Sequence, residues 1–169
     1  RPDLFEGANW ILCPDADTPP EHFQRLHELI TSLNARVVAI APDEHDDSIA
    51  VVSHVPHIIA ASLVQLAHRH ADEQQSLMRL AAGGFKDITR IASSSPVMWE
   101  QICMTNTVNI SRLLQDYIDA LGVVQKELQE HDSASLYTFF DGARAYRDSF
   151  IDAGSGPIKK DYSIRLDIP

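Results

Sequence analysis

Apolar and polar positions in the first forty residues follow two patterns. Asn9–Cys13 and Arg36–Ile40 are short apolar runs followed closely by proline, which is typical of buried strands. Between them, apolar residues recur at helical spacing after Pro19-Pro20, with Thr18 as the expected cap and Asn34 as the expected end. The order strand, helix, strand predicts one βαβ unit, which normally belongs to a larger parallel sheet.

From Asp43 onward the apolar positions keep a helical period. Asp43–His70 is apolar on more than one face, as expected of a buried central helix, and Pro56 must kink or interrupt it. Gly83-Gly84 is expected to close the next helix, Asp72–Ala82. A linker, Gly154–Pro157, and a strand-like tail, Asp161–Pro169, follow the last helix. Phe85–Ala92 is expected to be a short amphipathic turn or helix. We expect helices at Asp43–His70, Asp72–Ala82, Pro96–Asn106 (capped by Ser95), Asn106–His131 and Ser133–Ala153.

One helix carries a heptad seam. Its apolar residues are spaced 4-3-4-3-4, which is the repeat of helices that pack side by side. Such a seam can belong to the core of one chain or to a subunit interface; its length favours a homodimer. The seam residues are Ile110, Leu114, Tyr117, Leu121, Val124 and Leu128.

Composition narrows the class of protein. The chain has 14 Lys+Arg against 24 Asp+Glu and a net charge of −10, which argues against a nucleic-acid partner. No apolar run approaches the ~20 residues of a membrane span, and no signal pattern is present. Cys13 and Cys103 suggest no disulfide framework. A soluble, cytoplasmic protein is expected.

The two ends indicate a longer polypeptide. The chain begins at Arg1 rather than Met, and it stops within an alternating strand pattern. Because a strand needs partners to bury its apolar face, we expect this sequence to be a piece of a larger protein.

A first candidate for chemistry is the segment Ser53–His57, in which His54 and His57 are three residues apart. Such a pair is either structural or part of a metal site. A metal site would need further ligands from His68, His70 or Asp72, which lie several turns away.

A second candidate segment is Gly83–Ala92, which carries Lys86, Asp87 and Arg90. Either these charges form surface ion pairs of little energy, or a partly buried Arg90 holds a carboxylate bidentately. A third segment, Pro96–Asn106, is an apolar helix that carries Trp99, and we interpret it as core packing.

The chain contains, in this order, the segments Asp3–Leu12, Pro42–Asp46, Ser53–His57, Gly84–Ala92 and Met98–Asn106. Together these five segments resemble the prephenate dehydrogenase family. The family joins a Rossmann domain to a helical domain that dimerises and closes over substrate, and some members add a regulatory ACT domain. The resemblance implies a mainly α fold, a helical dimerisation domain of the 6-phosphogluconate-dehydrogenase C-terminal type preceded by one βαβ remnant of a Rossmann sheet. Its domains would be residues 1–42, 43–153 and 154–169, the last a linker and first ACT-like strand.

The resemblance also implies roles for individual residues. His54 and His57 would lie beside the substrate, and Arg90 would bind a substrate carboxylate. His45 and Asp46 match the segment that enters the helical domain. No metal is implied. Supporting positions would be Ser53, Gly84, Lys86, Asp87 and Thr89.

Two elements of the family pattern do not occur in this sequence: the G-x-G-x-x-G dinucleotide fingerprint and the segment that supplies the catalytic histidine. Both are expected before Arg1. The implied reaction is oxidative decarboxylation of prephenate, or of arogenate, with NAD or NADP in tyrosine biosynthesis. Tyrosine would be an effector acting through the ACT-like domain. The alternative is a non-catalytic helical dimerisation module with structural or metal-binding histidines.

Overall fold

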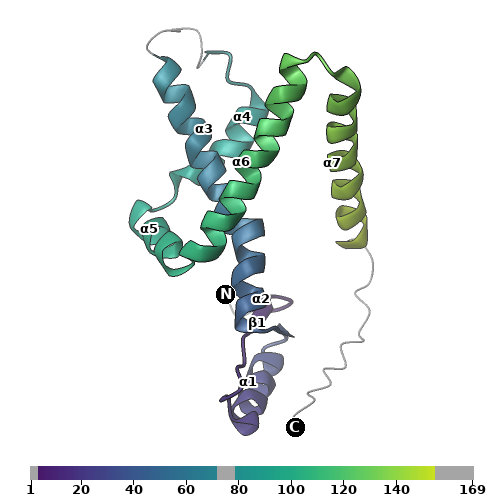
Figure 1. Ribbon diagram of the computed structural model, residues 1–169. Helices are drawn as coiled ribbons and strands as arrows, with labels where there is room; N and C mark the ends of the chain where they lie inside the picture. Colours follow the sequence, from purple (N-terminus) through teal and green to yellow (C-terminus); the bar gives the residue numbers. More distant parts are fainter. Residues whose placement is uncertain (1–3, 72–78, 155–169) are drawn as a thin grey trace. The chain divides into compact units, whose positions relative to one another are not determined.

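The computed structural model describes residues 4–71 and 79–154. These residues fall into two compact units, the first ending at Asp116 and the second beginning at Tyr117. The expected linker and ACT-like strand, and most of the expected helix Asp72–Ala82, lie outside the described residues. Of that helix, residues 79–82 are described; residue 79 is in a 3-10 conformation and residues 80–82 are not helical. The chain is mainly α-helical (Figure 1).

The N-terminal segment of the first unit is a βαβ unit, as the sequence predicts. Strand β1 (Asn9–Leu12), helix α1 (Pro20–Ser32) and strand β2 (Arg36–Ala39) follow in order. The strands pair in parallel, with Asn9 opposite Arg36 and Leu12 opposite Ala39. Its two strands are the whole sheet among the described residues.

The end of α1 is set by a residue in the left-handed region. Asn34 has φ 57°, a conformation that asparagine tolerates better than most residues, and it ends the helix as expected. Gly7, with φ 71°, donates its backbone N–H to the Asn34 carbonyl at 2.8 Å. The predicted cap at Thr18 is wrong: Thr18 donates its hydroxyl to Asp15 at 2.6 Å. Pro19 takes the cap position instead.

The long apolar helix is interrupted in the turn before Pro56, as expected. Helix α2 (Pro42–Ile49) continues into a π turn, η1 (Ala50–His54), and then into α3 (Val55–Ala71). Val55 donates its N–H to the Ala50 carbonyl, five residues back. Proline has no N–H and clashes with the carbonyl four residues before it, and the wider π turn accommodates that position.

The expectation that this helix is buried on several faces is wrong. Ala50, Val55 and Ala60 are buried, but Val52 is 72% exposed and Leu66 is 45% exposed. Among the described residues, Pro42–Ala71 is also one helix long and apolar enough to cross a membrane by length and composition alone. The expectation that no stretch approaches that size is therefore corrected.

The remaining elements of the first unit pack near α3. Gly83-Gly84 was expected to close the preceding helix. Instead, the glycine pair forms the first two residues of helix α4 (Gly83–Thr89). It leads into a 3-10 turn, η3 (Arg90–Ser93), and both contact α3. Helix α5 (Pro96–Thr105) has the expected cap, since the Ser95 hydroxyl accepts from the Met98 N–H at 3.5 Å.

Helix α6 (Thr107–Gln129) begins in the first unit and ends in the second. It carries the predicted seam, of which Ile110 is buried while Leu121 and Leu128 are 48% and 57% exposed. A turn at His131, with φ 55°, leads into α7 (Ser133–Gly154).

Candidate functional site

The π turn and α3 place His54 and His57 beside Trp99 of α5. The His57 ring stacks on the indole, with ring centroids 3.5 Å apart and an interplanar angle of 16°. The His54 ring meets the same indole edge-on at 6.2 Å. Trp99 does pack, as the sequence predicts, but its packing partners are the two candidate histidines.

The imidazole of His57 is buried, at 8% exposure. Burial lowers the pKa of His57 from its ordinary value of 6.5, because a desolvated imidazolium is disfavoured. A neutral ring stacked on an indole forms an apolar wall suited to a planar ring.

The indole of Trp99 also provides a donor. Its Nε1 is buried and has no hydrogen-bond partner among the described residues. A buried donor left unpaired costs free energy. This N–H is therefore a position where a ligand oxygen could be stabilised.

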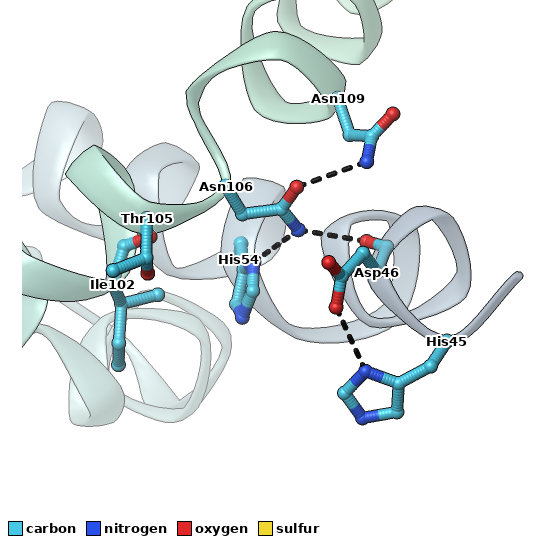
Figure 2. A network of polar contacts seen from close by, with 7 residues as sticks. All are labelled: His45, Asp46, His54, Ile102, Thr105, Asn106 and Asn109. Carbon is cyan, nitrogen blue, oxygen red and sulfur yellow. Dashed lines mark hydrogen bonds and ion pairs between the residues drawn. The ribbon is translucent and has the colours of Figure 1, made fainter. Parts of the chain in front are cut away.

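A polar network also includes His54 (Figure 2). The Asn106 side-chain nitrogen donates to the Asp46 carbonyl at 2.7 Å and lies 3.4 Å from His54 Nδ1. Its side-chain oxygen accepts from Asn109 at 2.9 Å. Asp46 is also paired with His45 Nδ1 at 2.9 Å.

The pKa of His54 is lowered from its ordinary value of 6.5. Burial is the main cause; the Asp46 carboxylate raises it and His45 lowers it further. Both candidate histidines therefore favour the neutral imidazole, which can donate or accept a hydrogen bond but carries no charge.

Arg90 lies at the start of η3, which packs against α3. Its side chain is exposed, so the expectation of a partly buried arginine is wrong. Within residues 4–71 and 79–154, it makes no ion pair with Asp87, so the surface ion-pair interpretation fails as well. No other carboxylate of the described residues pairs with its guanidinium either, and the planar donor set of arginine is suited to bind an anion.

The remaining predicted site residues lie on α4 and in the π turn. Thr89 donates its hydroxyl to the Phe85 carbonyl at 2.6 Å within α4, and Ser53 is half-buried in the π turn. Gly84, Lys86 and Asp87 are exposed on α4. In the described part of the chain, none of these five makes a hydrogen bond or ion pair with either candidate histidine.

No metal-ligand cluster occurs in the described ranges, where no three His, Cys, Asp or Glu residues come together. His68 and His70 lie at the far end of α3, and Asp72 lies outside the described residues. The absence of a metal in the complete protein stays a prediction.

The βαβ unit does not fit the phosphates of a dinucleotide. The connection from β1 to α1, residues 13–19, contains no glycine, and α1 begins with a proline, which has no N–H to donate. A phosphate site at a helix N-terminus depends on those N–H groups and on close approach of a glycine-rich turn.

Sequence reasoning did not identify Asn106 as a functional residue. The one available signal is its position between two predicted helices. A side chain at such a junction can contact groups of other elements. Its partners Asp46 and His54 are 60 and 52 residues away in sequence. A periodicity argument does not detect contacts of that range.

The family model and the curated relatives that match this chain agree with each other. The family model described as "Prephenate dehydrogenase, dimerization domain" matches residues 41–141. Prephenate dehydrogenase of Bacillus subtilis is 38% identical over 166 residues, covering 98% of this chain and 45% of that protein. Cyclohexadienyl dehydrogenase of Zymomonas mobilis is 28% identical over 146 residues, covering 86% of this chain and 50% of that protein. The chain spans about half the length of the curated relatives it matches.

Solved structures show the same architecture. Arogenate dehydrogenase of Synechocystis has a TM-score of 0.79 at 25% identity, covering 88% of this chain and 54% of that one. Prephenate dehydrogenase of A. aeolicus, solved in complex with hydroxyphenyl propionate and NAD+, has a TM-score of 0.81 at 27% identity. That match covers 88% of this chain and 52% of the other.

Proposed function

This chain belongs to the prephenate dehydrogenase family, and on that premise we propose that it is the substrate-side and dimer-forming part of such an enzyme. The complete protein would oxidatively decarboxylate prephenate to 4-hydroxyphenylpyruvate in tyrosine biosynthesis. Its relatives include a cyclohexadienyl dehydrogenase and an arogenate dehydrogenase, so arogenate is the second candidate substrate. A cytoplasmic enzyme is part of this proposal.

The reaction defines which groups are needed. The ring carbinol of prephenate would give a hydride to NAD(P)+ and its hydroxyl proton to a base, while the ring carboxylate leaves as carbon dioxide. The phenolate oxygen that results then takes a proton back to give 4-hydroxyphenylpyruvate. A fixed cation must hold a substrate carboxylate so that the carbinol hydrogen faces the acceptor. Neutral, partly apolar walls must surround the ring.

The observation that carries the proposal is the guanidinium of Arg90, which forms no ion pair among residues 4–71 and 79–154. It lies on η3, which contacts the helix that bears His57. Arginine binds carboxylates bidentately, which fixes orientation as well as charge. His57 and Trp99 provide the stacked, neutral surface, and the free indole N–H of Trp99 adds a donor.

This chain does not provide the whole catalytic set. The G-x-G-x-x-G fingerprint does not occur in its sequence, and its βαβ unit does not fit a dinucleotide. We therefore place NAD or NADP binding, and the catalytic histidine expected for the family, in parts of the protein outside this sequence. A tyrosine effector acting through an ACT-like domain would likewise involve residues beyond those described.

The subunit partner in this proposal is a second copy of the chain. Leu121 and Leu128 of the seam remain exposed, as do Tyr137 and Phe140 of α7. Large exposed apolar side chains on neighbouring helices are typical of an interface. The matched domain is itself described as a dimerization domain.

The test compares this chain with the complete protein. We expect the purified chain to show no prephenate-dependent reduction of NAD+ or NADP+, because it has no dinucleotide loop, and the complete protein to show it. Parallel assays with arogenate identify the preferred substrate. A folded complete protein inactive with both substrates would overturn the proposal. Bound metal in the purified chain would favour the dimerisation-module alternative.

A further inference from the structure

Asn106 occupies a junction where its backbone and side chain are both held. It lies between α5 and α6, its N–H donates to the Ile102 carbonyl at 3.2 Å, and it is 9% exposed. Its side-chain amide joins α6 to α2 and to the π turn (Figure 2). A residue held in this way has little freedom to change its hydrogen-bonding pattern.

The orientation of the Asn106 amide follows from one partner that cannot change roles. The Asp46 main-chain carbonyl only accepts, so the atom 2.7 Å from it must be the amide nitrogen. The amide oxygen then faces the side-chain nitrogen of Asn109, which donates to it at 2.9 Å. The flipped amide would place two acceptors against each other at Asp46.

This orientation determines which ring nitrogen of His54 carries the proton. The Asn106 nitrogen has two hydrogens, one used by Asp46, and the second is directed at His54 Nδ1, 3.4 Å away. An amide nitrogen does not accept a hydrogen bond, so Nδ1 must be the acceptor and hold no proton. In a neutral imidazole the proton is then on Nε2.

We propose that Asn106 is a positioning residue, which holds His54 as the neutral imidazole with its proton on Nε2. Figure 2 shows the second ring nitrogen of His54 facing away from Asn106. His54 thus presents an N–H donor that can bind an oxygen of an anionic substrate. It cannot accept the hydroxyl proton through that nitrogen, so it is not the catalytic base.

The charged form of His54 is disfavoured by the same contacts. An imidazolium has an N–H on both nitrogens, and the one on Nδ1 would meet the Asn106 donor. Burial opposes the charge as well and lowers the pKa of His54, although the Asp46 carboxylate partly offsets this. His45, the other titratable group that acts on His54, opposes the charge further.

The tautomer can be tested on this chain without any activity assay. Nitrogen-15 NMR distinguishes a protonated from an unprotonated ring nitrogen, and we expect the unprotonated signal of His54 to come from Nδ1. In Asn106→Leu the preference for Nε2–H should be lost. In Asn106→Asp, which has nearly the same size, the carboxylate should accept from Nδ1–H and move the proton to that nitrogen.

Matched controls are available in the same spectra. Asn109→Ala leaves both bonds from the Asn106 nitrogen in place, so the His54 tautomer should not change. The exposed His22 and His131 should keep their signals in every variant. The inference is overturned if Nδ1 of wild-type His54 is protonated, or if Nδ1 stays unprotonated in a folded Asn106→Asp.

The consequence for substrate binding rests on the proposed function. In the complete protein, Asn106→Asp should raise the KM for prephenate more than it lowers kcat, because a ground-state contact is lost. If the complete protein has no dehydrogenase activity, the proposed function fails while the tautomer measured by NMR still stands. If the enzyme is active and the KM of Asn106→Asp is unchanged, the binding role of His54 is wrong.

Discussion

The candidate site residues include two histidines that favour the neutral form and one arginine. His54 and His57 favour their neutral forms, because burial lowers both pKa values. Arg90 is exposed on η3 and offers the planar donor set of a guanidinium. Such a combination would let one cation attract a carboxylate while neutral rings surround the apolar part of the ligand.

Replacement of Arg90 tests this division of roles. In the complete protein, Arg90→Ala should raise KM for prephenate strongly and change kcat much less. Loss of a charge-assisted bidentate contact costs roughly 2–5 kcal/mol, so kcat/KM should fall on the order of 10²-fold or more. Arg90→Lys should restore only part of it, because lysine has no planar fork.

Steady-state kinetics and a melting curve on the same preparation check the Arg90 prediction. Arg25→Ala, an exposed arginine of α1, is the matched control and should change neither quantity. A lowered melting temperature with an unchanged KM would remove Arg90 from the site.

The lowered pKa of His57 predicts a pH dependence of stability. The unfolded imidazole titrates near 6.5, and the folded one at lower pH, so the unfolded chain binds more protons in that range. The free energy of unfolding should therefore be fully maintained above 6.5 and fall as the pH drops toward the folded pKa. Urea unfolding at pH 7.5 and pH 5.5 measures the difference.

His57→Gln should reduce that difference, whereas His22→Gln, an exposed site on α1, should not. Keeping the pH above about 5 avoids titration of Asp15 and Asp132, whose pKa values lie below 3.8. An equal pH dependence in wild type and His57→Gln would refute the assignment.

At the level of elements, helix ends and interruptions decide where side chains are presented. The π turn before Pro56 adds a residue to one turn, and it lies just where His54 must face Asn106 while His57 faces Trp99. The turn between α6 and α7 also has a defined pattern of backbone hydrogen bonds. His131 and Asp132 donate their N–H groups to the carbonyls of Leu128 and Glu127, a Schellman ending.

Asp132 is the N-cap of α7 and should stabilise it measurably. One of its carboxylate oxygens accepts from the Ser135 N–H at 3.1 Å and the other from the Ser135 hydroxyl at 2.7 Å. These bonds lower the pKa of Asp132. Asp132→Ala should lower the free energy of unfolding, because the first turn of α7 loses its capping hydrogen bonds, and urea denaturation measures the difference.

Asp132→Asn is the control for the cap, because asparagine keeps an acceptor oxygen and caps about as well. It should retain most of the stability of the wild type. If alanine and asparagine destabilise the chain equally, the hydrogen bonds of the cap are not the cause.

At the scale of the whole molecule, the described part of one chain leaves much apolar surface uncovered. In the second unit, Leu121 and Leu128 of α6 and Phe140 and Phe150 of α7 are all exposed. Burial of apolar surface contributes about 25 cal/mol per Å², so covering these faces would favour association.

A charge in the seam should therefore break the proposed dimer. Leu121→Glu would bury a carboxylate without a partner, a change that costs several kcal/mol in an apolar interface. Sedimentation should show a dimer for the wild type at micromolar concentration and a monomer or an unfolded chain for the variant. Glu21→Gln on the exposed face of α1 is a neutral control, and a monomeric wild type would contradict the prediction.

Much of the fold follows from the sequence alone, because periodicity and local capping are short-range properties. The βαβ unit, the break at Pro56, the Ser95 cap and the helices α6 and α7 all appear where patterns of apolar spacing place them. The caps and turns that were predicted wrongly, Thr18 and Gly83-Gly84, are places where several local solutions have similar energies.

The sequence predicted which segments carry the candidate site residues, but not which contacts those residues make. The motifs indicated His54, His57 and Arg90, but which neighbours they have depends on contacts across 40 to 60 residues. Only the tertiary structure decided that His57 stacks on Trp99, that Asn106 donates to His54, and that Arg90 is exposed rather than partly buried. The physical reason is that a residue's burial and its hydrogen-bond partners are properties of packed elements, whereas the elements themselves are encoded by neighbours along the chain.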